Sequence, residues 1–243
     1  MLYENRISNG EIMARNQGIA DITFLIDTSG SMQECIDGLK ENISSFIDTL
    51  AGPQSSLKDW RGKVVGYRDI TFDQEWYIDN PFVSSAEELK MQLGSLKAKG
   101  GFDEPESLLD ALHKLLNSPP SNSEEKDADK WRPVQDAARV IVVFTDASYH
   151  EVMTYEEGKG GQVSDVMDSI EQERTHLFLF APDLPCYEEL AQVDKSQWEP
   201  IEAPYVANLK EISSNTDKFR DIIIALARGI SSSVETYQSV VIL

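Results

Sequence analysis

Three polar segments of the sequence carry carboxylates where a hydrophobic stretch or a helix has just ended. Residues 27–31 (DTSGS) hold Asp27, Ser29 and Ser31, and residues 99–106 (KGGFDEPE) hold Asp103 and Glu106. The third segment begins with Asp146, after the apolar run at 138–145. Carboxylate and hydroxyl oxygens together select hard divalent cations, namely Mg²⁺, Mn²⁺ or Ca²⁺. If the fold brings the three segments together, they predict a metal site made of oxygen ligands.

Hydrophobic patterning indicates the elements that position these segments. Strands are expected at 20–26, 63–68, 138–145 and 176–180, with an edge strand or irregular excursion at 75–83, and helices at 36–50, 85–96, 108–116, 163–173, within 182–194 and at 217–234. Alternation of strands and helices predicts an α/β fold, with a doubly wound, mostly parallel central sheet and helices on both faces. Ligands bind such sheets beyond the carboxyl ends of the strands, where strand order reverses. The three acidic segments are expected there.

Length and composition indicate one globular domain. The chain has 243 residues, 41% of them hydrophobic and 26% charged, which is enough to bury a sizeable core. Asn9-Gly10 lies between two short runs that contain β-forming residues, a pattern typical of a hairpin. We therefore expect an N-terminal β-hairpin extension over residues 1–19 and a single domain over residues 20–243.

The charge and the cysteine content restrict the partners and the compartment. Lys and Arg number 22 against 42 Asp and Glu, a net charge of −20, and no basic run exceeds two residues. Nucleic acids and anionic membranes both require clustered basic side chains, so neither is expected as a partner. Cys35 and Cys186 lie outside any CxxC motif, and the first residues lack the apolar core of a signal peptide. We expect a cytoplasmic protein.

Two of the segments resemble those of von Willebrand factor A domains. DTSGSM at 27–32 matches the Asp-x-Ser-x-Ser motif of the metal-ion-dependent adhesion site, and an amphipathic helix follows it. VVFTDA at 142–147 is similar to the later strand of the family, which ends at a metal-site Asp. The resemblance covers about residues 20 to 230 in element order. It implies that Asp27, Ser29, Ser31 and Asp146 line a Mg²⁺ site, partly through water.

The remaining segment differs from the commonest pattern of the family, in which a Thr supplies a metal ligand. No Thr occurs between Lys90 and Asn117. The sequence DEPE at 103–106 instead resembles the Asp-x-Pro-Glu in the A-like domains of integrin β subunits, and bacterial intracellular A-domain proteins carry a similar loop. Glu106 is the best match for the ligand, and Asp103 is the alternative. In those integrin domains the loop Asp also serves a second, adjacent metal site, for which Asp103 and Asp69 are candidates.

The resemblance implies a binding module and not an enzyme. Neutral Ser ligands leave the metal with residual positive charge and an open position, which the Asp or Glu of a partner protein can fill, including a partner inside a multiprotein assembly. One alternative is a metal that only holds the loops together. The least favoured alternative is a hydrolase, metal-dependent or built on Ser31, Asp146 and His150. The sequence contains neither a GxSxG elbow nor a GxxxxGK loop.

Overall fold

A computed structural model of the chain describes residues 18–53, 55, 57–100, 104–122, 127–205, 207–208, 217, 221, 224 and 227–230. Of the hairpin extension predicted over residues 1–19, residues 1–17 lie outside the described residues, as does the candidate ligand Asp103, and Ile19 is the first residue of β1.

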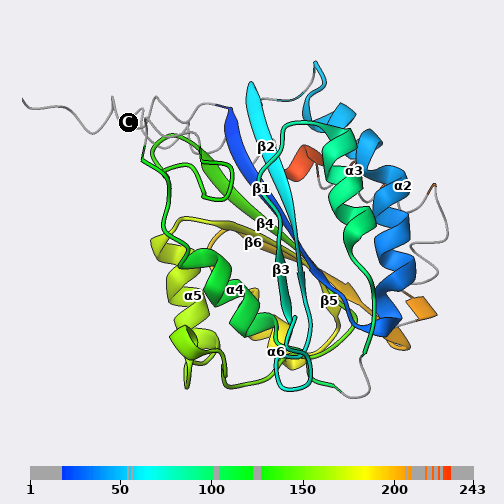
Figure 1. Cartoon of the computed structure of the whole chain (residues 1–243), viewed down its shortest axis with the longest axis vertical. Helices are drawn as coiled ribbons and strands as arrows, with labels where there is room; N and C mark the ends of the chain where they lie inside the picture. The colour runs from blue at the N-terminus through cyan, green and yellow to red at the C-terminus, as the bar shows by residue number, and fades with distance from the viewer. Residues whose placement is uncertain are drawn as a thin grey trace, which may run out of the picture.

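Six strands of the described residues form one sheet in the order β3-β2-β1-β4-β5-β6 (Figure 1). Their bounds are β1 (Ile19–Asp27), β2 (Asp59–Tyr67), β3 (Tyr77–Asp79), β4 (Ala138–Phe144), β5 (His176–Pro182) and β6 (Ser196–Ile201). Every neighbouring pair is parallel except β2 and β3, which are antiparallel. The predicted α/β fold with a mostly parallel sheet is confirmed.

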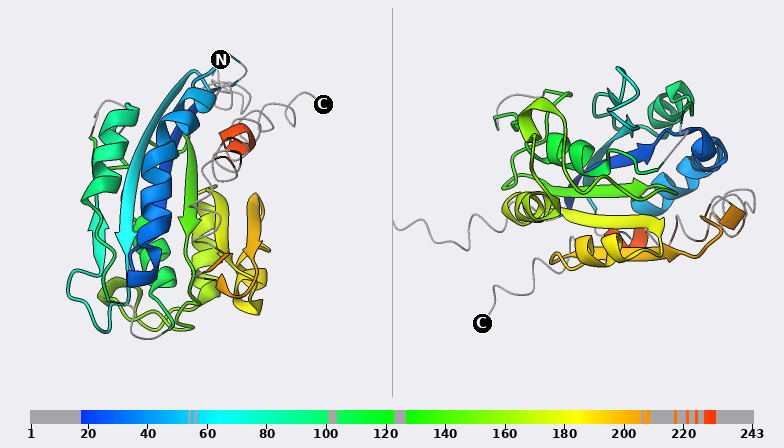
Figure 2. Two further views of the ribbon diagram at one scale, coloured as in Figure 1. Left: turned by 90° about the vertical axis from the view of Figure 1, so that its right-hand side faces the viewer. Right: turned by 90° about the horizontal axis from the view of Figure 1, so that it is seen from below.

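Helices cover both faces of the sheet, and Figure 2 shows the layers from two sides. One face carries α2 (Gln33–Leu50) and α3 (Ala86–Ser95), and the other carries α4 (Leu108–Leu116), α5 (Val163–Gln172) and α6 (Pro185–Leu190). Side chains alternate along β1, so Phe24 and Ile26 enter the first core while Leu25 enters the second. This alternation explains why the central strands are apolar on both sides.

Two short 3-10 helices complete the element order, η2 (Gly30–Met32) and η3 (Glu156–Gly158). Of the helix predicted at 217–234, residues 217, 221, 224 and 227–230 are described and are helical, and Ala227 and Ile230 are buried in the first core. Within the described ranges no helix is both long and apolar enough to span a membrane.

The strand β6 was not predicted, because its sequence SQWEPI contains Pro200 and lacks a buried apolar run. It lies at the edge of the sheet and pairs with β5 alone. The excursion predicted at 75–83 contains a three-residue edge strand, β3.

The strand order switches direction between β1 and β4, the two central strands. One half of the sheet continues outward from β1 through β2 and β3, and the other continues outward from β4 through β5 and β6. The register of β1 and β4 pairs Ile26 with Phe144, so the segments that follow the two strands begin side by side. The carboxyl end of β2 lies beside that of β1, because Asp27 of β1 is paired with Tyr67 of β2. The segments after β1, β2 and β4 therefore begin together at the carboxyl ends of the parallel strands, which we call the carboxyl edge of the sheet; the opposite end of these strands is the amino edge.

Candidate metal-binding site

Asp27 ends β1 and has no exposed surface. Its Oδ1 accepts the backbone N–H of Ser29 at 2.7 Å, and its Oδ2 accepts the hydroxyl of Thr145 at 2.8 Å. Burial and the nearby charge of Asp146 raise the pKa of Asp27 to about 6. The carboxylate is thus held by donors from two segments, and no ion pair joins it to a basic residue of the described chain.

Ser29 directly precedes η2, and Ser31 lies within it. The two hydroxyl oxygens are 3.2 Å apart, and the Ser31 hydroxyl also lies close enough to Asp146 to lower the pKa of that carboxyl in part. Gly30 lets the first and second segments approach, because a Cβ there would lie 2.9 Å from the carbonyl oxygen of Gly100. The Gly30 N–H donates to that same oxygen at 3.3 Å. Gly30 therefore permits the close backbone contact between the first and the second segment.

Asp146 follows β4 and is 3% exposed. Burial is the main cause that raises its pKa above the ordinary value. Its Oδ2 is buried and has no hydrogen-bond partner in the described part of the chain. A buried carboxylate oxygen without a donor is unfavourable unless a cation or a water occupies the space beside it.

A backbone bridge between Glu106 and Tyr149 brings Glu106 next to the third segment, which carries Asp146. The Glu106 N–H donates to the carbonyl of Ser148 at 2.9 Å, and its carbonyl accepts the N–H of His150 at 3.1 Å. The side chain is 2% exposed, and its Oε2 has no partner among the described residues. Burial, followed by the charges of Asp27 and Asp69, raises the pKa of Glu106 to about 8. Of the two candidates in the second segment, the described one thus lies among the other acids.

Asp69, the candidate for a second metal site, already has donors of its own. Thr71 donates its N–H to Oδ1 and its hydroxyl to Oδ2, each at 2.8 Å. His150 Nε2 lies 3.2 Å from Oδ1. The His150 considered for a hydrolase thus contacts Asp69, and no described contact joins it to Ser31.

The group of Asp27, Glu106 and Asp146 is defined here as the acidic cluster. Three buried carboxylates share one region, and no ion pair connects any of them to a described Lys, Arg or His. Among the described residues, no group of three or more His, Cys, Asp or Glu side chains is arranged to hold a metal ion by itself. A metal here therefore depends on the hydroxyls of Ser29 and Ser31, and oxygen ligands of this mixed type fit Mg²⁺, which keeps several waters.

Two exposed hydrophobic side chains lie on the loops that carry Asp69 and His150, a feature that the sequence pattern did not indicate. Phe72 is 75% exposed and Val152 is 44% exposed. The N–H of Phe72 donates to the carbonyl of Asp69 at 3.4 Å, and Val152 lies two residues after His150. Because His150 contacts Asp69, the two loops that carry these side chains meet beside the cluster.

The sequence analysis also did not identify Thr145 as part of the site. Thr145 directly precedes Asp146, and its hydroxyl donates to Asp27.

Comparisons with known proteins concern the fold and the family of this chain. Residues 21–128 match the family described as the von Willebrand factor A domain. The chain is 25% identical over 222 residues to the human von Willebrand factor A domain-containing protein 7, a match that covers 88% of this chain and 21% of that protein. The chain therefore spans about a fifth of the length of that relative.

A solved structure, that of proximal thread matrix protein 1 from the mussel byssus, superimposes with a TM-score of 0.52. The match covers 85% of this chain and 48% of the other, at 13% sequence identity, so it shows a shared fold. The family match and the strand order are consistent with a von Willebrand factor A type of α/β fold, and the solved structure shows the α/β fold alone.

Proposed function

We propose that this chain is a von Willebrand factor A domain that binds a partner protein through a divalent cation. The cation is held at the carboxyl edge of the sheet by Asp27, Ser29, Ser31, Asp146 and an acid of the second segment. Glu106 is the first choice for that acid, and Asp103 remains the alternative. The partner contributes an Asp or Glu carboxylate to the open position of the metal. Mg²⁺ is the expected ion, and Mn²⁺ or Ca²⁺ would also suit oxygen ligands.

The observation that carries this proposal is the uncompensated charge of the acidic cluster. Buried carboxylates are normally paired with a basic side chain or bound to a metal. Asp27, Glu106 and Asp146 have raised pKa values, and the free Oδ2 and Oε2 oxygens of Asp146 and Glu106 have no donor among the described residues. A divalent cation would supply the missing charge, and the Ser hydroxyls would add ligands without neutralising it.

The surroundings favour a protein partner over a small molecule. Phe72 and Val152 expose apolar surface on the loops that carry Asp69 and His150, and such surface is typical of contacts with another protein. A carboxylate that reaches the metal would then bring apolar side chains of the partner against these two residues. Salt screens the net charge of −20 beyond about 8 Å, so coordination at close range decides the contact. We include participation in a multiprotein assembly in this proposal.

Calorimetric titration of Mg²⁺ into the full chain tests the metal site. Asp27→Ala should remove binding while the protein stays folded, because Asp27 is the last residue of β1 and belongs to neither hydrophobic core. Asp168→Ala is the matched control, since Asp168 is an acid on α5 far along the chain from the cluster and its loss changes the net charge equally. Unchanged Mg²⁺ and Mn²⁺ affinity in Asp27→Ala would contradict the site.

Affinity purification from the native host in Mg²⁺ and in EDTA tests the interaction. EDTA should release the partner, and the double variant Ser29→Ala, Ser31→Ala should behave in the same way. If the partner stays bound in EDTA and to the double variant while Mg²⁺ still raises the melting temperature, the metal only holds the loops together. This outcome would favour the structural alternative.

A cytoplasmic location is also part of the proposal. Cys35 and Cys186 are both free thiols, which is compatible with a reducing compartment. Fractionation of the native host would test it.

A further inference from the structure

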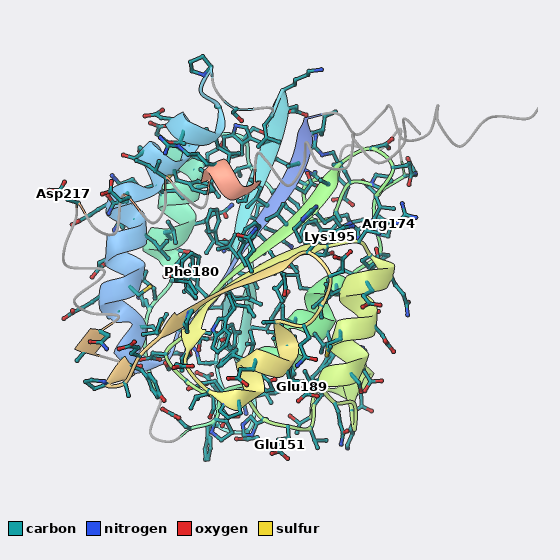
Figure 3. All side chains as sticks on the ribbon, turned by 180° about the vertical axis from the view of Figure 1, so that it is seen from behind. Glu151, Arg174, Phe180, Glu189, Lys195 and Asp217 are labelled. Carbon is teal, nitrogen blue, oxygen red and sulfur yellow. The ribbon has the colours of Figure 1, made fainter. Side chains whose placement is uncertain are left out.

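Arg68 is a buried basic side chain at the carboxyl edge of the sheet. It directly follows β2 and is 4% exposed. Figure 3 shows the two edges as opposite ends of the molecule, with Glu151 at the carboxyl edge and Lys195 at the amino edge. Within the described chain the ion-pair partner of Arg68 is Asp73, at 2.7 Å, and not a member of the acidic cluster. The charge of Arg68 therefore does not neutralise a carboxylate of the cluster.

The guanidinium of Arg68 connects three loops that are distant in the sequence. Its Nε donates to Thr28 Oγ1 at 3.1 Å, in the first segment. Its Nη1 donates to Asp73 Oδ2 at 2.7 Å, in the loop after β2. Its Nη2 donates to the carbonyl of Lys97 at 3.5 Å, two residues before the second segment. A guanidinium presents its donors in a fixed planar fork, so this one side chain fixes the relative positions of the three acceptors.

The loop after β2 is also bonded to the immediate neighbours of two proposed metal ligands. Thr28, which accepts from the guanidinium, directly follows Asp27. The N–H of Ile70 donates to Ser107 Oγ at 3.0 Å, and Ser107 directly follows Glu106. A displacement of this loop would therefore be transmitted to the segments that carry both ligands.

Carboxylates on separate loops repel one another before a metal binds. Burial is the main cause of the raised pKa of Glu106, and the charges of Asp27 and Asp146 add to it, which is the expected sign of this repulsion. A site whose ligands must first be brought together binds more weakly, because ordering of the segments costs free energy. Contacts that hold the segments in the metal-free chain lower that cost.

We propose that Arg68 is a positioning residue of the metal site, whose guanidinium holds the first and second segments in place for the cation. This inference rests on the proposed function, from which it takes the metal and its ligands. The sign of the effect separates positioning from charge. A positive side chain repels a nearby cation, so loss of its charge alone would strengthen Mg²⁺ binding, whereas loss of positioning weakens it.

Calorimetric titration of Mg²⁺ into the full chain tests this sign. Arg68→Met removes the three contacts, and Arg68→Lys keeps the charge without the planar fork. Both variants should bind Mg²⁺ about tenfold more weakly than the wild type, because hydrogen bonds of a charged group are lost. Unchanged or tighter binding in either variant, with Mg²⁺ bound by the wild type, would overturn the proposal and leave the proposed function intact.

Lys63→Met is the matched control. Lys63 lies within β2, is 1% exposed and pairs with Asp79 at 2.7 Å, so its loss removes one buried positive charge, as the loss of Arg68 does. The variant should be less stable in urea unfolding and should keep the Mg²⁺ affinity of the wild type. Equal losses of Mg²⁺ affinity in Lys63→Met and Arg68→Met would assign the effect to general destabilisation and contradict the proposal.

Amide hydrogen exchange in EDTA tests the positioning without any metal. The Thr28 N–H donates to the Tyr67 carbonyl at 2.8 Å, and the Lys99 N–H donates to the Thr28 carbonyl at 3.0 Å. Arg68→Met should raise the exchange rates of both amides about tenfold, and Lys63→Met should leave them unchanged. Unchanged rates in Arg68→Met would overturn the proposal. If the wild type binds no Mg²⁺ while these rates rise, the proposed function fails and the holding of the segments by Arg68 stands.

Discussion

Asp21 and Asp27 lie near the two ends of β1, and neither has any exposed surface, yet their surroundings are opposite. Asp21 accepts two hydrogen bonds from the Arg61 guanidinium at 2.8 Å each. It also accepts the side-chain and backbone N–H groups of Arg132 at 2.7 Å each. Asp27 accepts one backbone N–H and one hydroxyl, and its charged neighbours are other acids.

The difference indicates how this fold treats buried charge. At the amino edge of the sheet the chain supplies its own cations, and Arg61 also donates to the carbonyl oxygens of Asp127 and Lys130. At the carboxyl edge the described chain supplies no cation to Asp27, Glu106 or Asp146. Buried charge that is paired within the fold is costly to unpair, whereas buried charge that has no partner favours an ion from outside.

The largest effect is expected at the balanced end. Asp21→Asn would leave Arg61 and Arg132 without their carboxylate, and removal of one partner from a buried ion pair typically costs about 3–5 kcal/mol. Urea unfolding measures this change in the free energy of unfolding. Asp59→Asn is the matched control, because Asp59 also pairs with Arg132 but its side chain is 58% exposed, and its loss should cost less than about 1 kcal/mol. Equal costs for the two variants would break the comparison.

A change of opposite sign is expected at the unbalanced end. Glu106→Gln replaces a carboxyl that must take up a proton on folding at pH 7 by a neutral amide, and it should raise the metal-free free energy of unfolding by about 1–3 kcal/mol, because one raised pKa unit corresponds to about 1.4 kcal/mol. The same variant should lose the stabilisation that Mg²⁺ gives the wild type. Unfolding in EDTA and in Mg²⁺ measures both effects. Lower stability of Glu106→Gln in EDTA would show that the charge of Glu106 is already balanced.

The pH dependence of stability provides a third test. The pKa of Glu106 is about 8 in the folded chain against an ordinary 4.5, so the folded state holds a proton that the unfolded state has released. Stability in EDTA should therefore fall as pH rises, by about 1–2 kcal/mol between pH 6.5 and 8. Below this window His176, whose pKa is lowered to about 4 by burial, acts in the opposite direction.

Melting temperatures across this window, in EDTA and in Mg²⁺, check the prediction. Mg²⁺ should remove the slope because it binds the deprotonated carboxylate, and Glu106→Gln should lack the slope in both buffers. A slope that persists in Glu106→Gln would assign it to another group.

The smallest effect concerns the exposed side chains. Phe72→Ser with Val152→Ser should weaken binding of the partner in Mg²⁺ by about tenfold, because the contact loses apolar burial. Met91→Ser is the control, since Met91 is 67% exposed but lies on α3, away from the acidic cluster. Titration of the purified partner compares the variants. Equal affinities would limit the interface to the metal and its ligands.

Local patterns were sufficient to predict most of the elements. The apolar run at 20–26 and the periodic helix that follows it predicted β1 and α2, because both depend on residues close in sequence. The Ser85 cap predicted the start of α3, and Ser85 Oγ accepts the Glu88 N–H at 3.2 Å. The pattern of β6 is not apolar, and only pairing with β5 makes it a strand. Alternation of elements was enough for the class of fold.

The sequence by itself determined which side chains could form a site: an acid and two serines after the first strand, an acid after the fourth strand, and two acids between them. The tertiary structure decided which charges are balanced. Thr145 reaches Asp27 across 118 positions, and Arg132 reaches Asp21 across 111. No local pattern distinguishes Asp21 from Asp27, because both follow or interrupt the same apolar run. Their difference arises from partners that only the folded sheet brings to each of its edges.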